Sequence, residues 1–318
     1  MKQNSSLYLE KKSEFSKNLY SKVFPQIQCY EKLRVNYLVW FFVIMILLTL
    51  IECYFGYFLF VTKIETDNAG LLKLFGLILF LPFAIYGIFK HLLISKFNKI
   101  VMRQLCKCFD SFKWTNKSKS FNDYLYQNAF VIPKHYDSVE HDDFFSGNYD
   151  GVEIKIDEVN YKQKVRTKRT TYYVSIFRGV VVNFSFNKKF SSHTVVKNNT
   201  LLHLSPSKEL KHTVLEDVVF EKQYDVFTTD EVESRYILTT AFMDRLNTLK
   251  KAFKSTEIIC SFYKENLIIS LKTGKDMFAF GSLFKSILEP KQYFAVFDEF
   301  YSILSIVDTL KLNQKIGL

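Results

Sequence analysis

Residues 37–62 read YLVWFFVIMILLTLIECYFGYFLFVT, an apolar stretch of 26 residues with Glu52 as its single charge. A helix needs about 20 apolar residues to cross the hydrocarbon core of a bilayer. The stretch therefore predicts a transmembrane helix, which starts too far from the N-terminus and is too long for a signal peptide. An ionisable residue inside a membrane is a candidate functional residue. Glu52 is therefore singled out, either paired with Lys73 or protonated and bonded within a homo-oligomer.

A second apolar stretch, LLKLFGLILFLPFAIYGIFKHLLI, follows at residues 71–94 after a short loop. The two stretches together predict a transmembrane helical hairpin over residues 37–95. Residues 1–36 carry seven Lys or Arg against three acids, and residues 96–120 carry seven against one. Because positive flanks stay on the cytoplasmic side, both termini are expected there. The expected location is the cytoplasmic (inner) membrane of a bacterium.

The composition of the whole chain fits this division. The 318 residues carry a net charge of +11, and the mean hydropathy is near zero although 24% of the residues are charged. Apolar residues must therefore be concentrated in part of the chain. Ten glycines and five prolines are too few for a collagen-like or linker-rich protein. Five cysteines, an odd number, do not suggest a disulfide framework and fit a reducing compartment.

The region before the first span, residues 1–36, has the pattern of an amphipathic helix. Its apolar side chains recur at helical spacing with lysines between them: Phe15, Leu19, Tyr20, Val23 and Phe24. Such a helix either lies on the membrane surface or packs against the protein's own cytoplasmic domain. The pattern leaves both interpretations open.

Residues 96–150 are expected to form a helical and loop connector, and residues 151–318 a cytoplasmic α+β domain with antiparallel strands. Strands are predicted at 152–156, 171–187, 216–220, 223–227, 258–263 and 267–271, with the last two forming a hairpin. A helix is predicted from Thr229 or Asp230, either of which suits the N-cap, to about residue 253. A closing helix is predicted at 292–312.

An acidic segment contains the candidate metal ligands. Residues 121–158 hold nine acids against two lysines, and His141, Asp142 and Asp143 stand side by side within them. Imidazole and carboxylate groups are metal ligands. Adjacent residues rarely point at one centre, however, so a solvated or ion-paired acidic loop is the favoured explanation.

A basic segment follows at once. Residues 159–200 hold nine Lys or Arg and no acid, and the densest part contains Lys162, Lys164, Arg166, Lys168 and Arg169. Residues two apart share one face of a strand. A continuous strand would therefore turn the basic side chains toward the same face as Val152, Ile154 and Ile156. The sequence predicts either a bulge near residues 157–161 or a protruding hairpin tip. The surface would bind anionic lipid or another anion, or would pair with the acidic segment before it.

Four sequence blocks resemble a family of bacterial membrane proteins known only as the domain of unknown function 3137. The blocks are HDDFFSGNYDGVEIKIDEV (141–159), RGVVVNFSFNKKFSSHTVV (178–196), DEVESRYILTTAFMDRL (230–246) and LKLN (310–313). Ser191-Ser192 departs from the usual Ser-Gly pair, and Lys188-Lys189 is more basic than usual. The resemblance implies an inner-membrane protein with an N-terminal helix, two spans and a cytosolic domain. It implies no activity or cofactor.

No phosphate-binding, dinucleotide-binding, zinc-protease or serine-hydrolase motif occurs in the sequence. The expected function is therefore a membrane-anchored binding or scaffold module, and neither catalytic activity nor a cofactor is expected. Its expected partners are membrane lipid and either a second copy or another protein, and nucleic acid is not expected. Two alternatives are a metal-dependent enzyme that uses His141, Asp142 and Asp143, and a module that binds anionic lipid.

Overall fold

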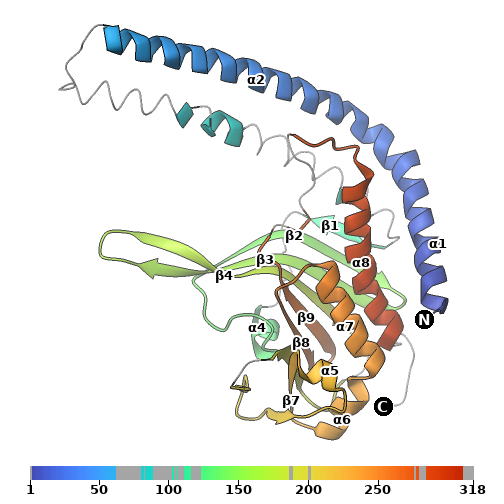
Figure 1. The fold of residues 1–318 in the computed structure, drawn as a ribbon. Helices are drawn as coiled ribbons and strands as arrows, with labels where there is room; N and C mark the ends of the chain where they lie inside the picture. The colour runs from blue at the N-terminus through green and yellow to red at the C-terminus, as the bar shows by residue number, and fades with distance from the viewer. Residues whose placement is uncertain are drawn as a thin grey trace. The chain divides into compact units, whose positions relative to one another are not determined.

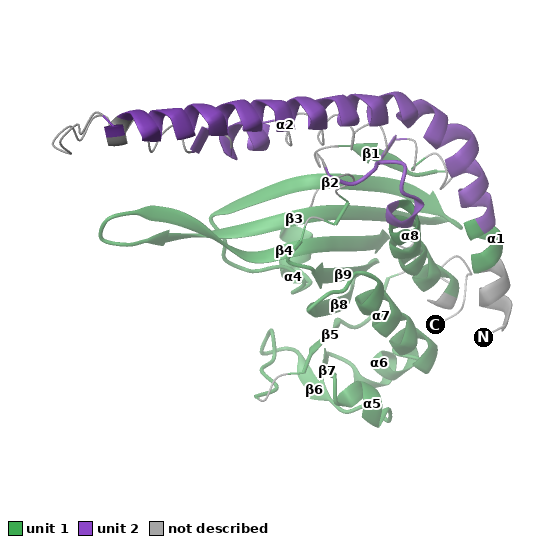
Figure 2. Cartoon of the chain, turned by 45° about the horizontal axis from the view of Figure 1, so that its top comes forward, with its two compact units in different colours: residues 1–12, 106–278, 293–318 green, residues 13–105, 279–292 purple. Residues whose placement is uncertain are grey.

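The computed structural model describes residues 2–61, 80–81, 83–88, 102–103, 106, 111–115, 123–185, 189–199, 202–275, 277–278 and 284–310. The chain divides into two compact units (Figure 2). The first contains residues 1–12, 106–278 and 293–318, and the second contains residues 13–105 and 279–292. The predicted loop at 63–70 and most of the second predicted span lie outside the described residues. Of that span, residues 80–81 and 83–88 are helical.

The first unit is built on one nine-stranded antiparallel sheet, with strand order β1-β2-β3-β4-β9-β8-β5-β7-β6 (Figure 1). The strands are β1 (Lys113–Thr115), β2 (Ser138–Tyr149), β3 (Val152–Arg166), β4 (Thr171–Ser185), β5 (Thr194–Asn198), β6 (Lys211–Thr213), β7 (Tyr224–Thr228), β8 (Glu257–Tyr263) and β9 (Asn266–Lys272). The sheet confirms the antiparallel α+β class. It includes two strands, β1 and β2, that lie in the segment expected to be a connector.

The helices are α1 (Lys2–Asn18), α2 (Phe24–Val61), α4 (Asp123–Asn128), α5 (Val218–Glu221), α6 (Glu231–Ile237), α7 (Thr240–Ala252) and α8 (Pro290–Leu310), with a π-helical turn η1 at Leu19–Val23. The side chain of Asp230 accepts hydrogen bonds from two backbone N–H groups and caps α6, as the sequence predicts. The helix expected to run to residue 253 is divided, because Thr239 caps a second helix, α7.

One strand prediction, at residues 216–220, is wrong. Asp217 accepts hydrogen bonds from the backbone N–H groups of Val219 and Phe220, and so starts the short helix α5. An Asp side chain at this position satisfies N–H groups that a helix leaves unpaired at its first turn. The capping bonds favour a helix over an extended chain.

The two faces of the sheet have different cores. Directly paired residues share a face, so Phe145, Ile156, Val182 and Ile269 form a row across four strands. Phe145 packs edge-on against Phe300 of α8, with ring centroids 4.9 Å apart. On the opposite face, the chain around α4 packs on a second row. That cluster includes Tyr126, Val131, Val159, Tyr161, Phe177, Val181 and Ile268.

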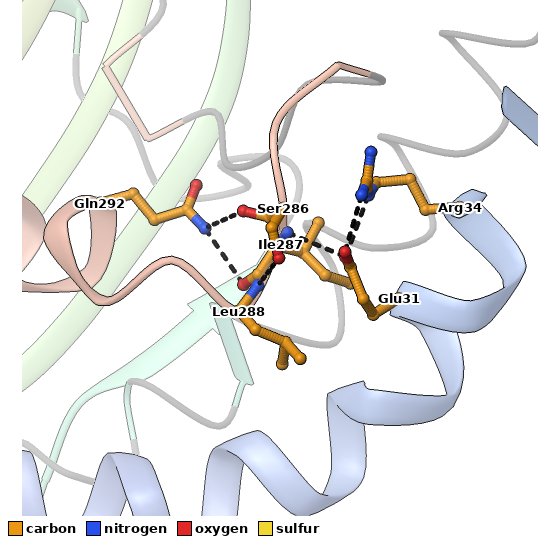
Figure 3. A network of polar contacts seen from close by, with 6 residues as sticks. All are labelled: Glu31, Arg34, Ser286, Ile287, Leu288 and Gln292. Atoms are coloured by element: carbon orange, nitrogen blue, oxygen red, sulfur yellow. Dashed lines mark hydrogen bonds and ion pairs between the residues drawn. The ribbon is translucent and has the colours of Figure 1, made fainter.

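The second unit contains α2, which is long and apolar enough to cross a membrane. Most large side chains along residues 39–61 are exposed, including Trp40, Ile46, Leu50 and Tyr54. Near the start of α2, Arg34 donates hydrogen bonds to Glu31, which accepts another from the backbone N–H of Ile287 at 3.0 Å (Figure 3). Burial alone would raise the pKa of Glu31, but these hydrogen bonds outweigh it and lower the pKa.

The amphipathic pattern of the N-terminal region corresponds to a buried helical stripe. Phe15, Leu19, Val23 and Ile27 are each at most 2% exposed. Farther toward the N-terminus, the Tyr8 hydroxyl donates to Asp298 of α8 at 2.8 Å. Of the five residues of the predicted pattern, Phe15, Leu19 and Val23 are buried, Phe24 is half-buried and Tyr20 is exposed. The choice between a position on the membrane surface and packing against the cytoplasmic domain stays a prediction.

Candidate functional site: a basic arm and a polar pocket

Strands β3 and β4 extend past their neighbours as a two-stranded arm, defined here as residues 163–175. Strand β4 pairs with β9 over residues 179–185, and β2 pairs with β3 only as far as Lys162. Beyond these points β3 and β4 pair with each other. The pairing runs from Gln163 opposite Val174 to Arg166 opposite Thr171. Figure 1 shows the arm projecting from the sheet. The arm is the protruding hairpin that the basic run predicted as one of two alternatives.

The pairing of β3 with β4 shifts between Tyr161 and Lys162, so that Ile176 has no direct partner. The extra residue lies in β4, so the side chains of β3 still alternate between its two faces. The predicted bulge in β3 is therefore not what exposes the basic side chains. Lys164 and Arg166 are exposed because this part of β3 and β4 extends beyond β2 and β9.

The arm has one basic face and one apolar face. Lys164 lies directly opposite Tyr173, and its ammonium is 6.0 Å from the centre of that ring. The other face carries Val165 opposite Tyr172, followed by Val174 opposite Gln163. Tyr172 and Val174 are 48% and 41% exposed, which is unusual for apolar residues of a strand. The arm is therefore amphipathic and open to solvent on both faces.

At the tip, Lys168 and Arg169 are exposed within a turn closed by Thr167 and Thr170. At the base, Lys162 pairs with Glu140 of β2, and the backbone N–H of Lys164 donates to Asp137. The acidic segment thus covers the base of the arm only. The function of the basic residues as a lipid or anion surface remains a prediction.

The predicted metal ligands lie at a bulge in β2, where its pairing with β3 shifts between His141 and Phe144. The Nδ1 atom of His141 lies 3.0 Å from an oxygen of Asp157, which is buried. Burial alone would lower the pKa of His141, but the contact with Asp157 outweighs it and raises the pKa. An ion pair between these two residues explains the arrangement without a metal.

The two neighbouring acids lie in different environments. Asp143 is buried and accepts a hydrogen bond from Nε1 of Trp114 at 2.6 Å, whereas Asp142 is exposed. A cavity of about 230 Å³ lies beside His141. Its lining is Glu140, His141, Asp142, Glu158, Val159, Asn160 and Arg178. The lining mixes acids with bases, and a metal site at residues 141–143 remains a prediction.

Glu52 lies on α2, the helix with the length and composition of a membrane span. Its Oε1 atom is covered by protein and has no hydrogen-bond partner within the described part of the chain. The carboxylate therefore points away from the exposed side of the helix. Its role remains a prediction.

Sequence reasoning did not single out one group of possible ligands. His203, His212 and Asp225 have ligand atoms within 4.8 Å of one another. Asp225 is 22 residues from His203, and strand pairing rather than sequence spacing brings them together. No strand was predicted at either histidine, so nothing in the sequence placed them beside Asp225.

The fold and the arm define an α+β protein with a helix suited to a membrane anchor. Residues 175–312 match the family described as "Protein of unknown function (DUF3137)", the family that the sequence blocks resemble. Three of those blocks fall wholly or partly in the match. Two of them are joined in space, because Glu233 of α6 accepts hydrogen bonds from the backbone N–H and the hydroxyl of Ser191.

Among solved structures, the chain is similar to the mycobacterial trehalose monomycolate transport factor A, TtfA. The identity is 8%, the TM-score is 0.35, and the alignment covers 65% of this chain and 91% of that one. No curated protein matches the sequence.

Proposed function

We propose that this protein is a membrane-anchored binding module whose basic arm docks on anionic lipid head groups. Helix α2 and a second helix at residues 71–94 form the anchor, and both termini lie on the cytoplasmic side of a bacterial inner membrane. The charge bias of the flanks supports this orientation. The sheet domain acts by binding rather than by catalysis.

The observation that carries the proposal is the two-faced, uncovered surface of the arm. Tyrosine has an apolar body and a polar tip, which suits it to the boundary between head groups and acyl chains. Tyr172 and Tyr173 supply such groups, and Val174 adds an exposed apolar side chain. Positive charge comes from Lys164, Arg166, Lys168 and Arg169. Each basic residue near an anionic surface contributes about 1 kcal/mol. Four of them give a strong preference for anionic over neutral lipid.

The anchor favours lipid over other anions as the ligand. A membrane-anchored domain experiences head groups at a high local concentration, which converts weak contacts into stable docking. A nucleic acid or an acidic protein lacks this advantage.

The test uses the full chain with Tyr172→Trp, reconstituted into vesicles of phosphatidylcholine alone or with about one-third phosphatidylglycerol. Docking moves residue 172 from water into the interface, so its emission should shift to the blue only in the anionic vesicles. The response should fall as salt rises, because charges are screened over about 8 Å at physiological ionic strength. The parent protein contains Trp40 and Trp114, so its emission spectrum is subtracted from that of the Tyr172→Trp variant.

The charges are tested by Lys164→Gln, Arg166→Gln, Lys168→Gln and Arg169→Gln together, which should abolish the shift. The matched control changes four exposed cations elsewhere on the sheet domain: Lys208, Lys222, Lys251 and Arg235. The control should retain the shift. Equal emission in neutral and anionic vesicles, or equal loss in both variants, would refute the proposal.

A further inference from the structure

At the far edge of the sheet from β1, two histidines and an aspartate gather on one face. His212 lies in the edge strand β6 and pairs directly with Phe227 of β7. Asp225 precedes Phe227 by two residues, so it lies on the same face of β7 as Phe227 and diagonally from His212. His203 comes from the connection between β5 and β6 and reaches the same aspartate.

The ligand atoms of these residues surround a common point. Nδ1 of His203 lies 2.6 Å from Oδ1 of Asp225, and Nε2 of His212 lies 3.8 Å from the same oxygen. The two imidazole rings have centroids 5.0 Å apart. Ligands about 2.0–2.2 Å from a tetrahedral zinc ion lie roughly 3.3 Å from each other. These two spacings bracket that value, and all the ligand atoms lie within 4.8 Å of one another. Small movements of the exposed imidazoles would complete the geometry.

The site combines a fixed carboxylate with movable imidazoles. Asp225 is 1% exposed, whereas the side chains of His203 and His212 are 49% and 34% exposed. His203 also has a positive φ of 42°, which is uncommon for a residue with a side chain. The connection therefore holds a strained backbone at the residue that faces Asp225, which indicates a constraint at this position.

A nearby cation has its own partners. Lys197 of β5 lies opposite Asp225 in the strand register, but its ammonium donates to the carbonyl of Leu204 and lies 4.9 Å from the centre of the Phe227 ring. These contacts fix the connection beside His203. The positive charge lowers the affinity for a metal cation without filling the ligand positions.

We propose that His203, His212 and Asp225 form a binding site for a divalent transition-metal ion of the Zn²⁺ type. Two imidazoles with one carboxylate suit such ions better than Mg²⁺ or Ca²⁺, which prefer oxygen ligands. Three protein ligands leave a fourth position for water or for a group from a partner. The ion would join the connection between β5 and β6 to the edge of the sheet.

The probe is Zn²⁺ itself, added to the detergent-solubilised full chain after removal of metals with a chelator. Competition with a chromophoric chelator should give one ion per chain. His203→Gln and His212→Gln should each weaken binding at least tenfold. The matched control is His135→Gln, an exposed histidine on the same unit, which should leave binding unchanged.

Co²⁺ provides a second readout, because visible absorption reports the number and type of its ligands. The spectrum of a four-coordinate ion should form with the parent protein and vanish in the double variant His203→Gln, His212→Gln. The two histidines are partly exposed, so this variant should keep the circular dichroism of the parent. Absence of stoichiometric Zn²⁺, or binding that the double variant retains, would overturn the site. Loss of binding in His141→Gln instead would assign the metal to the pocket on β2.

Discussion

The ammonium of Lys162 lies 2.5 Å from a carboxylate oxygen of Glu140, at the base of the arm. Within the arm, farther from the sheet than this pair, four basic residues are exposed: Lys164, Arg166, Lys168 and Arg169. The hydrogen bond from Lys162 lowers the pKa of Glu140 and outweighs the opposing effect of burial. The carboxylate therefore stays ionised at neutral pH and offsets one positive charge of the basic run.

Replacement of Glu140 should strengthen docking of the arm. Glu140→Gln removes the offsetting charge, which is equivalent to about 1 kcal/mol or a fivefold gain near an anionic surface. Vesicles should then produce the blue shift of Tyr172→Trp at a lower content of phosphatidylglycerol. Glu209→Gln, at an exposed acid away from the arm, should have no effect. A weaker response in Glu140→Gln would show that the pair organises the arm instead.

Gly179 of β4 forms the end pair between β4 and β9, opposite Lys272. A Cβ atom at this position would lie 1.9 Å from the carbonyl oxygen of Leu271 in β9, a contact that backbone movement alone could relieve. Gly179→Ala should therefore destabilise the domain by about 3 kcal/mol, or roughly 6–12 °C in thermal unfolding. Val174→Ala, in the exposed arm, should leave the unfolding temperature nearly unchanged. Similar temperatures for both variants would contradict this interpretation.

The bond from Trp114 to Asp143 should contribute to stability. Asp143 is buried, so Trp114→Phe removes a donor from a carboxylate that water does not reach freely. The expected loss is about 1–3 kcal/mol in denaturant unfolding. Asp142→Asn changes an exposed neighbour and should cost little. Equal stability of the Trp114→Phe variant and the parent would contradict this prediction.

Glu299 of α8 should make the stability of the domain depend on pH. Burial raises its pKa from about 4.5 to about 8, with Asp298 acting in the same direction and Lys254 against it. The folded state therefore holds a proton that the unfolded chain releases between these values. The stabilising contribution is complete below pH 4.5 and is lost as the pH rises through 8.

Glu299→Gln keeps the side chain neutral at every pH. The variant should match the parent near pH 5 and exceed it by several degrees in unfolding temperature at pH 8.5. Glu289→Gln, at an exposed acid just before the same helix, serves as the control. A parallel pH dependence in the parent and the Glu299 variant would show that Glu299 is not the titrating group.

Local signals predicted much of the sheet domain. The predicted hairpin of residues 258–263 and 267–271 is present as β8 and β9, and Asp230 marked the start of α6. Ile156 and Lys162 would share one face of a continuous strand, and this conflict correctly predicted a protruding hairpin as one of two alternatives, whereas the bulge that was the other alternative lies in β4 and not in β3. These features depend on a few neighbouring residues, so the sequence carries them directly.

Long-range pairing could not be predicted in the same way. The segment around His141 was expected to be a loop, but pairing with both β1 and β3 makes it a strand. His203 and Asp225 meet because β7 lies between β5 and β6, an order that no local pattern records. The candidate metal site was missed for this reason.

The arm itself is the place to test the account most directly. A photoreactive phenylalanine analogue is placed at Tyr173 in the reconstituted full chain, and illumination links it to whatever it contacts. The account predicts a lipid adduct, seen by mass spectrometry, in vesicles with phosphatidylglycerol, and its loss when Lys164, Arg166, Lys168 and Arg169 are changed to Gln. Absence of a lipid adduct in the anionic vesicles, or an adduct of equal yield in neutral vesicles, would contradict it.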